Sequence, residues 1–415
     1  MDINNDLKKS SAIKPAGLSY AWTIVMLGTI LSIVIYTYNN TFGVFYKPFA
    51  DYFGWSRAAI ALAFTIRSLV CAVLVVPMGY WADRYGIRKI ILPSFILLGL
   101  CMMAVAKVGS LWQLYLVQGV GIGICMSGPV TCIIATVAKW HDKRRGMAIG
   151  ITSAGFGLSS VIFPPLATFL IQAVNWKFAT FILGVIILVI GIPCSLLFKE
   201  PLDSVKQTPT SGKGSPAGIF DAWKPLAYYL KSPVFLSIII MFMLISAFGN
   251  MLSSHFINYA TDIGISAIVA AGMMSTMGIA GTIGRLGMGV ISDRIGNKSY
   301  AAICWLLMAL SFALFITKQT ALLWVAAVPF GIGYGGTIPL PPAIMGERMD
   351  TNQLNTATGV GIVGGLIGAA VGPWLGGLIF DVTGHYLWAL ILGILGCLTG
   401  LFIALRIPPP RRNIS

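Results

Sequence analysis

An arginine inside an apolar segment is the first feature of this sequence that could do chemistry. Arg285 lies in "GTIGRLGMGVISDRIG" (281–296), eight residues before Asp293. In a helix, that spacing places it about 12 Å from the aspartate. A guanidinium group offers a planar fork that matches the two oxygens of a carboxylate. The residue type therefore predicts a buried site for a small organic anion.

The sequence offers Arg285 few internal partners. The chain has only 13 Asp and Glu residues, and all of them fall in tails, loops or the ends of predicted helices. A charge within an apolar span is usually retained because it faces a cavity or a partner. A structural ion pair is the alternative, but the missing carboxylates favour a ligand that comes from outside.

The composition identifies the environment of this arginine. Of the 415 residues 57% are apolar and 10% are charged, and the mean hydropathy is +0.85, which excludes a soluble domain. A hydrocarbon core of about 30 Å needs roughly 20 apolar residues per helix. Long continuous apolar runs favour helices over the alternating strands of a membrane barrel. We predict an all-α membrane protein with twelve transmembrane helices at 18–46, 56–80, 90–107, 111–138, 147–173, 176–198, 233–260, 266–291, 300–317, 321–344, 356–380 and 386–406.

The distribution of basic residues predicts the orientation. With the N-terminus inside, 21 of the 28 Lys and Arg residues fall on the inner side, five in outer loops and two within helices. Positive residues accumulate on the cytoplasmic side of membrane proteins. We therefore expect tails 1–17 and 407–415 in the cytoplasm of a multi-pass cell-membrane protein. The net charge of +15 then indicates topology and contact with anionic lipid, with no reason to expect nucleic acid.

Several other kinds of site are not expected. The seven cysteines fall inside predicted helices without a CxxC motif, so we expect neither disulfides nor a metal site, and no cofactor. No nucleophile, base and orienting residue can be assembled in one cavity, so we do not expect an enzyme. The first apolar run is too long for a cleavable signal. We expect a monomer.

The chain contains an internal repeat. Three pairs of segments match at an offset of 209 or 210 residues: 77–89 with 287–299, 121–129 with 331–339, and 150–164 with 359–373. Six predicted helices separate equivalent elements, so both halves have the same orientation and are related by an axis along the membrane normal. We predict six-helix bundles at 18–198 and 233–406, joined by a polar cytoplasmic linker at 199–232.

The repeated segments also carry a family resemblance. "GYWADRYGIRK" (79–89) and "GVISDRIGNK" (289–298) resemble the signature loop of the major facilitator superfamily, and the resemblance covers all twelve helices. "FYKPFADYFGWSRA" (45–58) and "GPWLGGLIFDVTGHY" (372–386) resemble the monocarboxylate transporter and oxalate:formate antiporter branch. The resemblance implies the major facilitator fold and a secondary active transporter that works by alternating access.

The resemblance suggests further contacts to the anion. Tyr115 and Tyr334 fall on the fourth and tenth helices, which line the cavity in this superfamily, and either hydroxyl could donate to the anion or simply pack. Asn40 follows Tyr36 by one turn on the first helix. Both therefore share a face that either contacts substrate or marks a polar helix end.

Arg67 in "AFTIRSL" (63–69) departs from the antiporter pattern, which has a small polar residue there. It precedes Asp83 by sixteen residues, about 24 Å from the inner end. It either snorkels to the outer face or provides a second anion contact. The helix at 356–380 lacks the second cation of oxalate-type antiporters, which argues against a dicarboxylate.

Proton coupling has two candidates. His255 is the side chain near the pathway that could titrate around neutral pH, although a packed neutral histidine is equally compatible with the sequence. Lys47 matches a lysine that monocarboxylate transporters use. Those proteins also carry an aspartate one turn before the arginine, and here that position is Gly281.

The repeated loops predict an inner gate. Asp83 and Asp293 would cap facing helix N-termini, while Arg84 and Arg294 would pair with acids or carbonyl groups.

Taken together, these features predict a carrier for a short monocarboxylate such as lactate or pyruvate, coupled to protons. An anion exchanger of the oxalate:formate kind is the alternative.

Overall fold

The computed structural model describes residues 16–141, 145–201, 232–340, 344–345 and 351–407. Within these ranges the fold is entirely helical, and twelve helical spans are long and apolar enough to cross a membrane. The predicted all-α class and the predicted number of crossings are thus confirmed.

The first half contains six crossings, of which the first and the fourth are broken into shorter segments. Asn175 caps the last helix by accepting from the Phe178 N–H, as short polar side chains do at helix N-termini. The elements are α1 (Ala16–Ile35), α2 (Thr37–Thr41), η1 (Phe42–Phe45), α3 (Tyr46–Phe53), α4 (Arg57–Tyr85), α5 (Arg88–Val105), α6 (Leu111–Leu114), the π-helical η2 (Tyr115–Gly121), α7 (Ile122–Met126), α8 (Pro129–Trp140), α9 (Arg145–Ala173) and α10 (Trp176–Leu197).

In the described part of the second half, six helices are long enough to cross a membrane. They are α13 (Pro233–Asp262), α14 (Ala267–Ile295), α15 (Asn297–Ile316), α16 (Thr320–Thr337), α18 (Thr351–Thr383) and α19 (Leu387–Arg406). Gly264 and Gly384 follow α13 and α18 with φ of 93° and 74°, a conformation that favours glycine.

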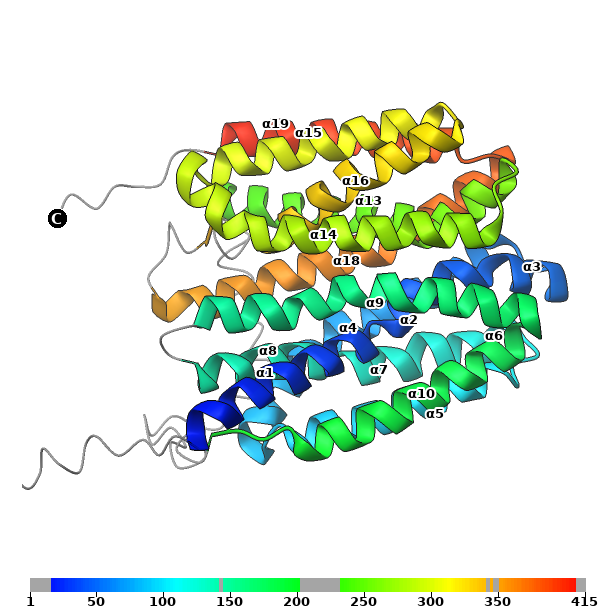
Figure 1. Cartoon of the computed structure of the whole chain (residues 1–415). Helices are drawn as coiled ribbons and strands as arrows, with labels where there is room; N and C mark the ends of the chain where they lie inside the picture. Colours follow the sequence, from blue (N-terminus) through cyan, green and yellow to red (C-terminus); the bar gives the residue numbers. More distant parts are fainter. Residues whose placement is uncertain (1–15, 142–144, 202–231, 341–343, 346–350, 408–415) are drawn as a thin grey trace, which may run out of the picture.

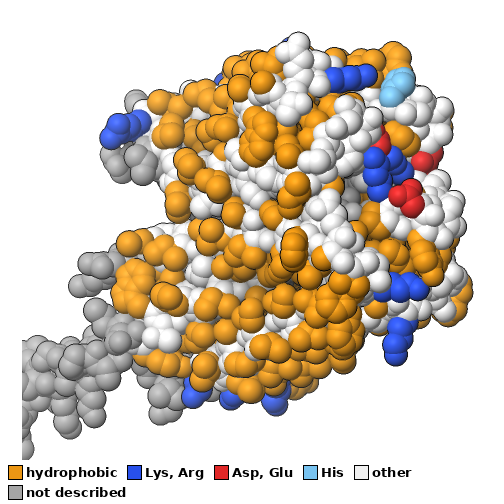
Figure 2. Space-filling view, turned by 45° about the vertical axis from the view of Figure 1, so that its right-hand side comes forward, with side chains coloured by type: hydrophobic (Ala, Val, Ile, Leu, Met, Phe, Trp, Pro, Cys, Tyr) orange, Lys and Arg blue, Asp and Glu red, His pale blue; other side chains and the backbone are white. Residues whose placement is uncertain are grey.

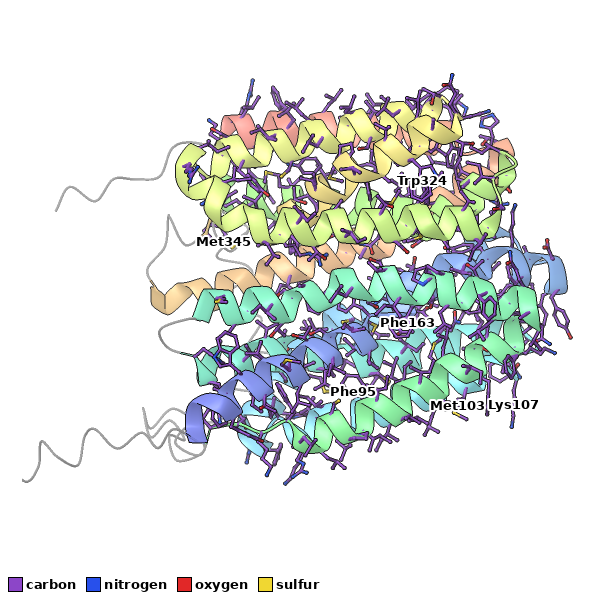
Figure 3. The ribbon with its side chains drawn as sticks, viewed as in Figure 1. Phe95, Met103, Lys107, Phe163, Trp324 and Met345 are labelled. Atoms are coloured by element: carbon purple, nitrogen blue, oxygen red, sulfur yellow. The ribbon has the colours of Figure 1, made fainter. Side chains whose placement is uncertain are left out.

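The two halves lie side by side as separate groups of roughly parallel helices (Figure 1), with α1–α10 in one group and α13–α19 in the other. We call the side where α1 begins and α19 ends the tail side, and the opposite side, where α3 ends, the loop side. Lys107 lies toward the loop side and Met345 toward the tail side (Figure 3). This two-part arrangement places one interface along the middle of the molecule.

The sequence repeat has a counterpart in the backbone. Gly86 ends α4 with φ and ψ of 86° and 144°, and Gly296 ends α14 with 82° and 148°. These glycines are equivalent in the repeat, 210 residues apart. Both halves therefore make the same turn after their second long helix, with a positive φ that disfavours other residues.

Two predicted helices differ from the observed ones. The fourth crossing is interrupted by η2 and by a break at Gly128, before Pro129, whose ring cannot continue a regular helix. The first crossing bends at Tyr36 and continues to Phe53 rather than ending at 46. At Gly43 a Cβ atom would lie 2.4 Å from the Ser254 carbonyl oxygen, so glycine permits the bent segment to contact α13.

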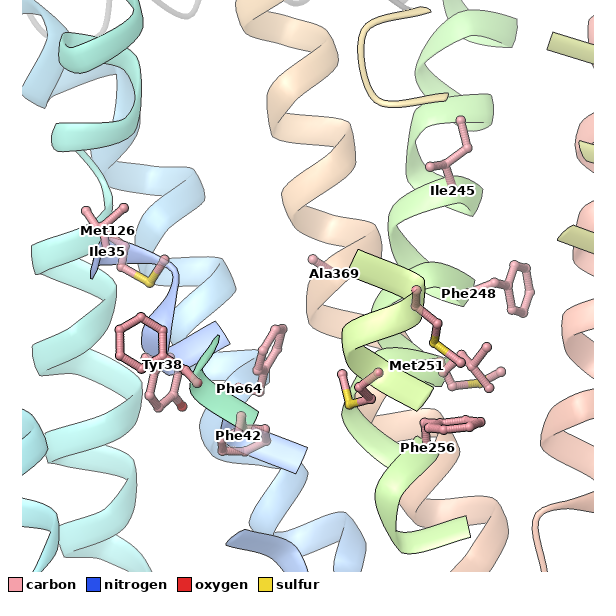
Figure 4. Packing of buried hydrophobic residues seen from close by; sticks show 14 of the residues in the cluster. Ile35, Tyr38, Phe42, Phe64, Met126, Ile245, Phe248, Met251, Phe256 and Ala369 are labelled. Carbon is pink, nitrogen blue, oxygen red and sulfur yellow. The ribbon is translucent and has the colours of Figure 1, made fainter. Parts of the chain in front are cut away.

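Both halves contribute large buried aromatic side chains to the core. Tyr38, Phe42 and Phe64 lie in the first half, while Phe248 and Phe256 of α13 lie in the second (Figure 4). Each of these side chains is at most 8% exposed. They belong to one continuous core, and ring contacts cross between the halves, as where Tyr46 packs on His255 with 4.7 Å between ring centres.

Candidate functional site

A cavity of about 370 Å³ lies between the two halves. Its wall extends toward the tail side as far as Val75, Ile134 and Ile338. The space-filling view is hollowed between the halves on that same side (Figure 2). Tyr36, between α1 and α2, and residues of α2, α4, α7, α8 and α9 line it from the first half, and residues of α13, α14, α16 and α18 line it from the second.

Two arginines from opposite halves line this cavity, Arg67 from α4 and Arg285 from α14. Among the described residues, no aspartate or glutamate lines it, and none lies within ion-pair distance of either guanidinium group. The other polar side chains are Tyr36, Asn39, Asn40, Ser127, Thr131, Ser160, Ser246, Asn250, Ser253 and Tyr334. The cavity is therefore positively charged and rich in neutral hydrogen-bonding groups.

Arg285 has few partners of its own. Its Nη1 lies 3.5 Å from the Ser153 carbonyl oxygen, at the limit of a hydrogen bond. Its Nε is buried without an acceptor in the described part of the chain. The guanidinium carbon lies 6.0 Å from the Phe156 ring centre. Since a guanidinium has five N–H donors, most of its capacity is available to a ligand.

Arg67 lies inside the cavity wall rather than at the outer face. The residue is 4% exposed. Its Nη1 contacts the Met126 sulfur at 3.3 Å, and its Nη2 donates to the Ser68 hydroxyl at 3.1 Å. Nε has no acceptor among the described residues. The guanidinium carbon lies 4.0 Å from the centre of the Phe64 ring. Its partners are weak, and none carries a negative charge.

Three of the predicted polar contacts line the same cavity. Tyr36 packs on Phe156 with 4.4 Å between ring centres, and Asn40 donates to the Phe156 carbonyl at 3.4 Å. Asn250 donates to the Tyr334 hydroxyl oxygen at 3.3 Å. Because that oxygen accepts from the amide, the Tyr334 O–H remains able to donate to an anion.

Tyr115, predicted either to donate to the anion or to pack, does not line this cavity. Its hydroxyl donates to the Ala59 carbonyl at 3.0 Å. It is the fifth residue of its crossing, which begins at Leu111 on the loop side, so it lies about one turn from that end. Tyr115 therefore lies too close to the loop-side end of its helix to contact the centre of the cavity.

The loop side is closed by a group of charged residues that we call the clasp: Lys47, Arg57, Asp262, Asp381 and Tyr386. Arg57 forms a bidentate ion pair with Asp262, with N–O distances of 2.6 and 3.1 Å. Lys47 contacts the same carboxylate at 2.7 Å. Figure 2 shows acidic and basic side chains gathered between the halves on this side. The clasp joins the first half to the second.

Asp381 completes the clasp by capping a helix of the other half. Its two carboxylate oxygens accept from the backbone N–H groups of Arg57 and Ala58 at 2.9 and 2.7 Å. These are the first residues of α4, where unpaired N–H groups and the helix dipole favour a negative charge. The contact therefore fixes the end of α18 against the start of α4.

His255 lies beneath the clasp and not in the cavity wall. Its Nε2 lies 2.7 Å from the Pro373 carbonyl, and its Nδ1 lies 3.0 Å from the Tyr386 hydroxyl. A carbonyl only accepts, so Nε2 carries a proton and Nδ1 of the neutral ring accepts from Tyr386. The Tyr386 oxygen accepts from Arg57 at 2.7 Å. Burial raises the pKa of the Tyr386 hydroxyl, which keeps it a donor.

The predicted inner gate is only partly described. The side chains of Asp83 and Asp293 lie outside the described residues. Arg84 and Arg294 are exposed near the tail-side ends of α4 and α14. Lys47, predicted for proton coupling, belongs to the clasp and contacts Asp262 instead of the cavity.

The sequence reasoning missed the clasp. Asp262 and Asp381 fall at the outer ends of two predicted helices, opposite Lys47 and Arg57 at the outer ends of two others. Acidic residues are few in this chain, so two acids and two cations on the same outer side could have indicated ion pairs between these helices. What the sequence did not provide was the pairing of the helices.

Comparisons with known proteins agree on one family. A sequence profile described as "Major Facilitator Superfamily" matches residues 27–298 and 257–415. Monocarboxylate transporter 13 of Rattus norvegicus is 25% identical over 95% of this chain and 90% of its own length. Monocarboxylate transporter 12 of Xenopus laevis is 26% identical over 93% and 88%. An MFS-type transporter of Bacillus subtilis, YcxA, is 23% identical over 94% and 95%.

Solved structures share the fold at lower identity. The nucleoside transporter NupG superposes with a TM-score of 0.71 at 15% identity, over 92% of this chain and 98% of its own. A bacterial homologue of the human lysosomal transporter Spinster, in an inward-facing and occupied conformation, gives a TM-score of 0.71 at 16% identity over 95% and 96%. Identities this low support the arrangement of helices and nothing finer.

Proposed function

This chain belongs to the Major Facilitator Superfamily, and from that premise we propose that it transports a small monocarboxylate of the lactate or pyruvate kind. One observation carries the proposal. Arg285 lies in a cavity between the halves, without a carboxylate partner among the described residues. Burying an unpaired guanidinium costs free energy, because the charge loses its contact with water. A bound carboxylate offsets that cost.

The residues around Arg285 suit a short carboxylate. In the proposed complex, Arg285 binds the two carboxylate oxygens with parallel hydrogen bonds. The Tyr334 hydroxyl donates to the anion, while Tyr36 and Asn40 contact the rest of the molecule. Aromatic and methionine side chains, including Phe156 and Met277, provide the apolar part of the wall. The relatives named monocarboxylate transporters support this choice of substrate.

We assign the tail side to the cytoplasm because the inner segments carry most of the Lys and Arg residues. With that orientation, the hollow on the tail side makes this an inward-facing conformation, and the clasp closes the outside. Transport then requires the clasp to separate while the tail side closes. Asp83, Arg84, Asp293 and Arg294 remain our proposal for the tail-side latch of that second state.

Proton coupling is proposed to act through the clasp. The neutral His255 ring accepts from Tyr386, which in turn binds Arg57. A protonated ring has two donors and no acceptor, and it adds a positive charge next to Arg57. Protonation from outside would therefore weaken the closed clasp. Opening would be favoured when the outer pH is low, because the state that binds more protons gains stability as pH falls.

Uptake of labelled lactate into proteoliposomes tests the proposal, with and without an inward proton gradient and with nothing loaded inside. We expect accumulation that follows the gradient. Uptake that occurs only when a counter-anion is loaded inside would replace symport with exchange. If neither condition gives uptake of any short carboxylate, the anion-transport proposal fails.

A further inference from the structure

We infer that Arg67 is a second anion-binding residue, so that the cavity prefers a straight-chain dicarboxylate longer than oxalate over a simple monocarboxylate. The inference rests on the part of the proposed function that makes Arg285 the anion site, and it replaces the short monocarboxylate with a dicarboxylate as the preferred anion. Both guanidinium groups line the same cavity, one from each half.

The charge balance of the cavity is the first argument. Two cations line it, and no acidic residue does so in the described part of the chain. Each charge removed from bulk water carries a desolvation cost that only a counter-charge offsets. A monocarboxylate neutralises one guanidinium and leaves the other uncompensated. A dicarboxylate neutralises both and therefore gains more from binding.

The positions of the arginines indicate two separate subsites. Arg67 precedes Asp83 by sixteen residues, and Arg285 precedes the equivalent Asp293 by eight. Because the halves are related by an axis along the membrane normal, the two arginines are staggered by eight residues, about 12 Å of helix rise. The two guanidinium groups therefore come from different depths of the two halves. An anion with two carboxylates separated by several carbons matches this arrangement better than a single carboxylate does.

The wall between the arginines suits such a chain. Tyr36 and Tyr334 lie close enough to interact electrostatically with both guanidinium groups. Phe156, Met274 and Met277 line the same space and would contact methylene groups. The volume of about 370 Å³ falls in the range of ligand pockets, roughly 300–1,000 Å³, and exceeds the needs of a three-carbon acid.

The lack of a cation in helix 356–380 then does not exclude a dicarboxylate. That helix lacks a cation, as the sequence shows, but α4 supplies one through Arg67. A packing role through cation–π contact with Phe64 is the competing explanation. Such contacts are worth about 0.5–2 kcal/mol, and a packing role predicts no selectivity between anions.

Binding to the purified full-length protein distinguishes these roles. Thermal shifts give the affinities of butyrate, oxalate, malonate, succinate, glutarate and adipate for the wild type, Arg67→Gln, Arg67→Lys and Arg285→Gln. Lys177→Gln is the matched control, since it removes one positive charge from the same half on an exposed loop-side residue.

For the wild type, we expect succinate, glutarate or adipate to bind at least about tenfold more tightly than butyrate and oxalate, as an extra charged hydrogen-bond pair implies. Arg67→Gln should reduce these dicarboxylates to the level of butyrate while leaving butyrate unchanged. Arg67→Lys should keep much of the preference, and Lys177→Gln all of it. Arg285→Gln should lose both classes of anion.

Other results would overturn the inference in recognisable ways. If the wild type binds butyrate through Arg285 without gain from a second carboxylate, Arg67 does not bind the anion and the proposed function stands. Equal losses of both classes in Arg67→Gln would likewise assign Arg67 to packing. If Arg285→Gln binds normally, or if the wild type binds no carboxylate, the proposed function itself fails, and the inference fails with it.

Discussion

The clasp and the central cavity each contain two cations, and they differ in what neutralises them. In the clasp, Lys47 and Arg57 share the carboxylate of Asp262. In the cavity, Arg67 and Arg285 have no acidic partner among the described residues. A paired cation stabilises one conformation of the protein, whereas an unpaired cation in a cavity favours a ligand. The comparison therefore predicts which residues hold the gate closed and which bind the anion.

The largest expected effect is at Arg285, and it tests the cavity side of the comparison. Arg285→Gln should reduce carboxylate uptake by about a hundredfold or more, because it removes a charge-assisted pair of hydrogen bonds within a low-dielectric site. Uptake into proteoliposomes measures the loss, and size-exclusion chromatography confirms that the variant folds. Normal uptake by a folded variant would show that the unpaired cation is not the anion site.

Asp262→Asn tests the clasp, where we expect a smaller effect. An amide cannot neutralise Lys47 and Arg57, so the closed loop side should lose stability. The native Cys71 lines the cavity, and it can report access from outside. A membrane-impermeant maleimide added to intact cells should label Cys71 about fivefold faster in Asp262→Asn, because a partly exposed ion pair is worth about 1 kcal/mol.

Two controls accompany that experiment. Cys71→Ser in the Asp262→Asn background should abolish the additional labelling. Glu200→Gln removes the Lys139–Glu200 ion pair outside the clasp, and it should leave the labelling rate unchanged. Equal labelling of Asp262→Asn and wild type would mean that the clasp does not hold the loop side closed.

We propose that His255 links the clasp to the proton concentration, so its replacement should change the pH profile of transport rather than abolish activity. His255→Ala should make uptake nearly independent of outer pH, because the acceptor for Tyr386 is gone at every pH. The wild type should transport faster as the outer pH falls. Uptake measured across a series of outer pH values checks this, and an unchanged profile in the variant would assign His255 to packing.

The comparison also shows what the sequence could and could not predict. The twelve crossings followed from the length of the apolar runs, which the bilayer thickness constrains directly. The importance of Arg285 followed from its cost in an apolar helix. The sequence placed the acids and cations of the clasp on the same outer side, but it could not predict their ion pairs, which join residues such as Arg57 and Asp262, 205 positions apart. Their contact depends on how the two halves meet, which no local pattern specifies.

The two tyrosines show that assigning a helix to the cavity does not place each of its side chains there. Tyr115 and Tyr334 were each predicted on a helix expected to line the cavity. They differ in depth: Tyr115 lies one turn from the loop-side end of its crossing, and Tyr334 lies fourteen residues into α16. The predicted spans 111–138 and 321–344 already place Tyr115 near the end of its helix and Tyr334 deep within its own. The family resemblance assigned whole helices to the cavity and did not use that depth.

The smallest expected effect is at these tyrosines, and it tests which hydroxyl contacts the anion. Tyr334→Phe removes one neutral hydrogen-bond donor, worth about 1 kcal/mol, so the affinity for carboxylates should fall about fivefold. Tyr115→Phe removes a hydroxyl that bonds Ala59, and it should leave affinity unchanged. Thermal shift with butyrate and succinate measures both variants. Equal losses would show that the tyrosines act through packing, whereas a loss confined to Tyr334 would extend the anion site from Arg285 to its hydroxyl neighbour on α16.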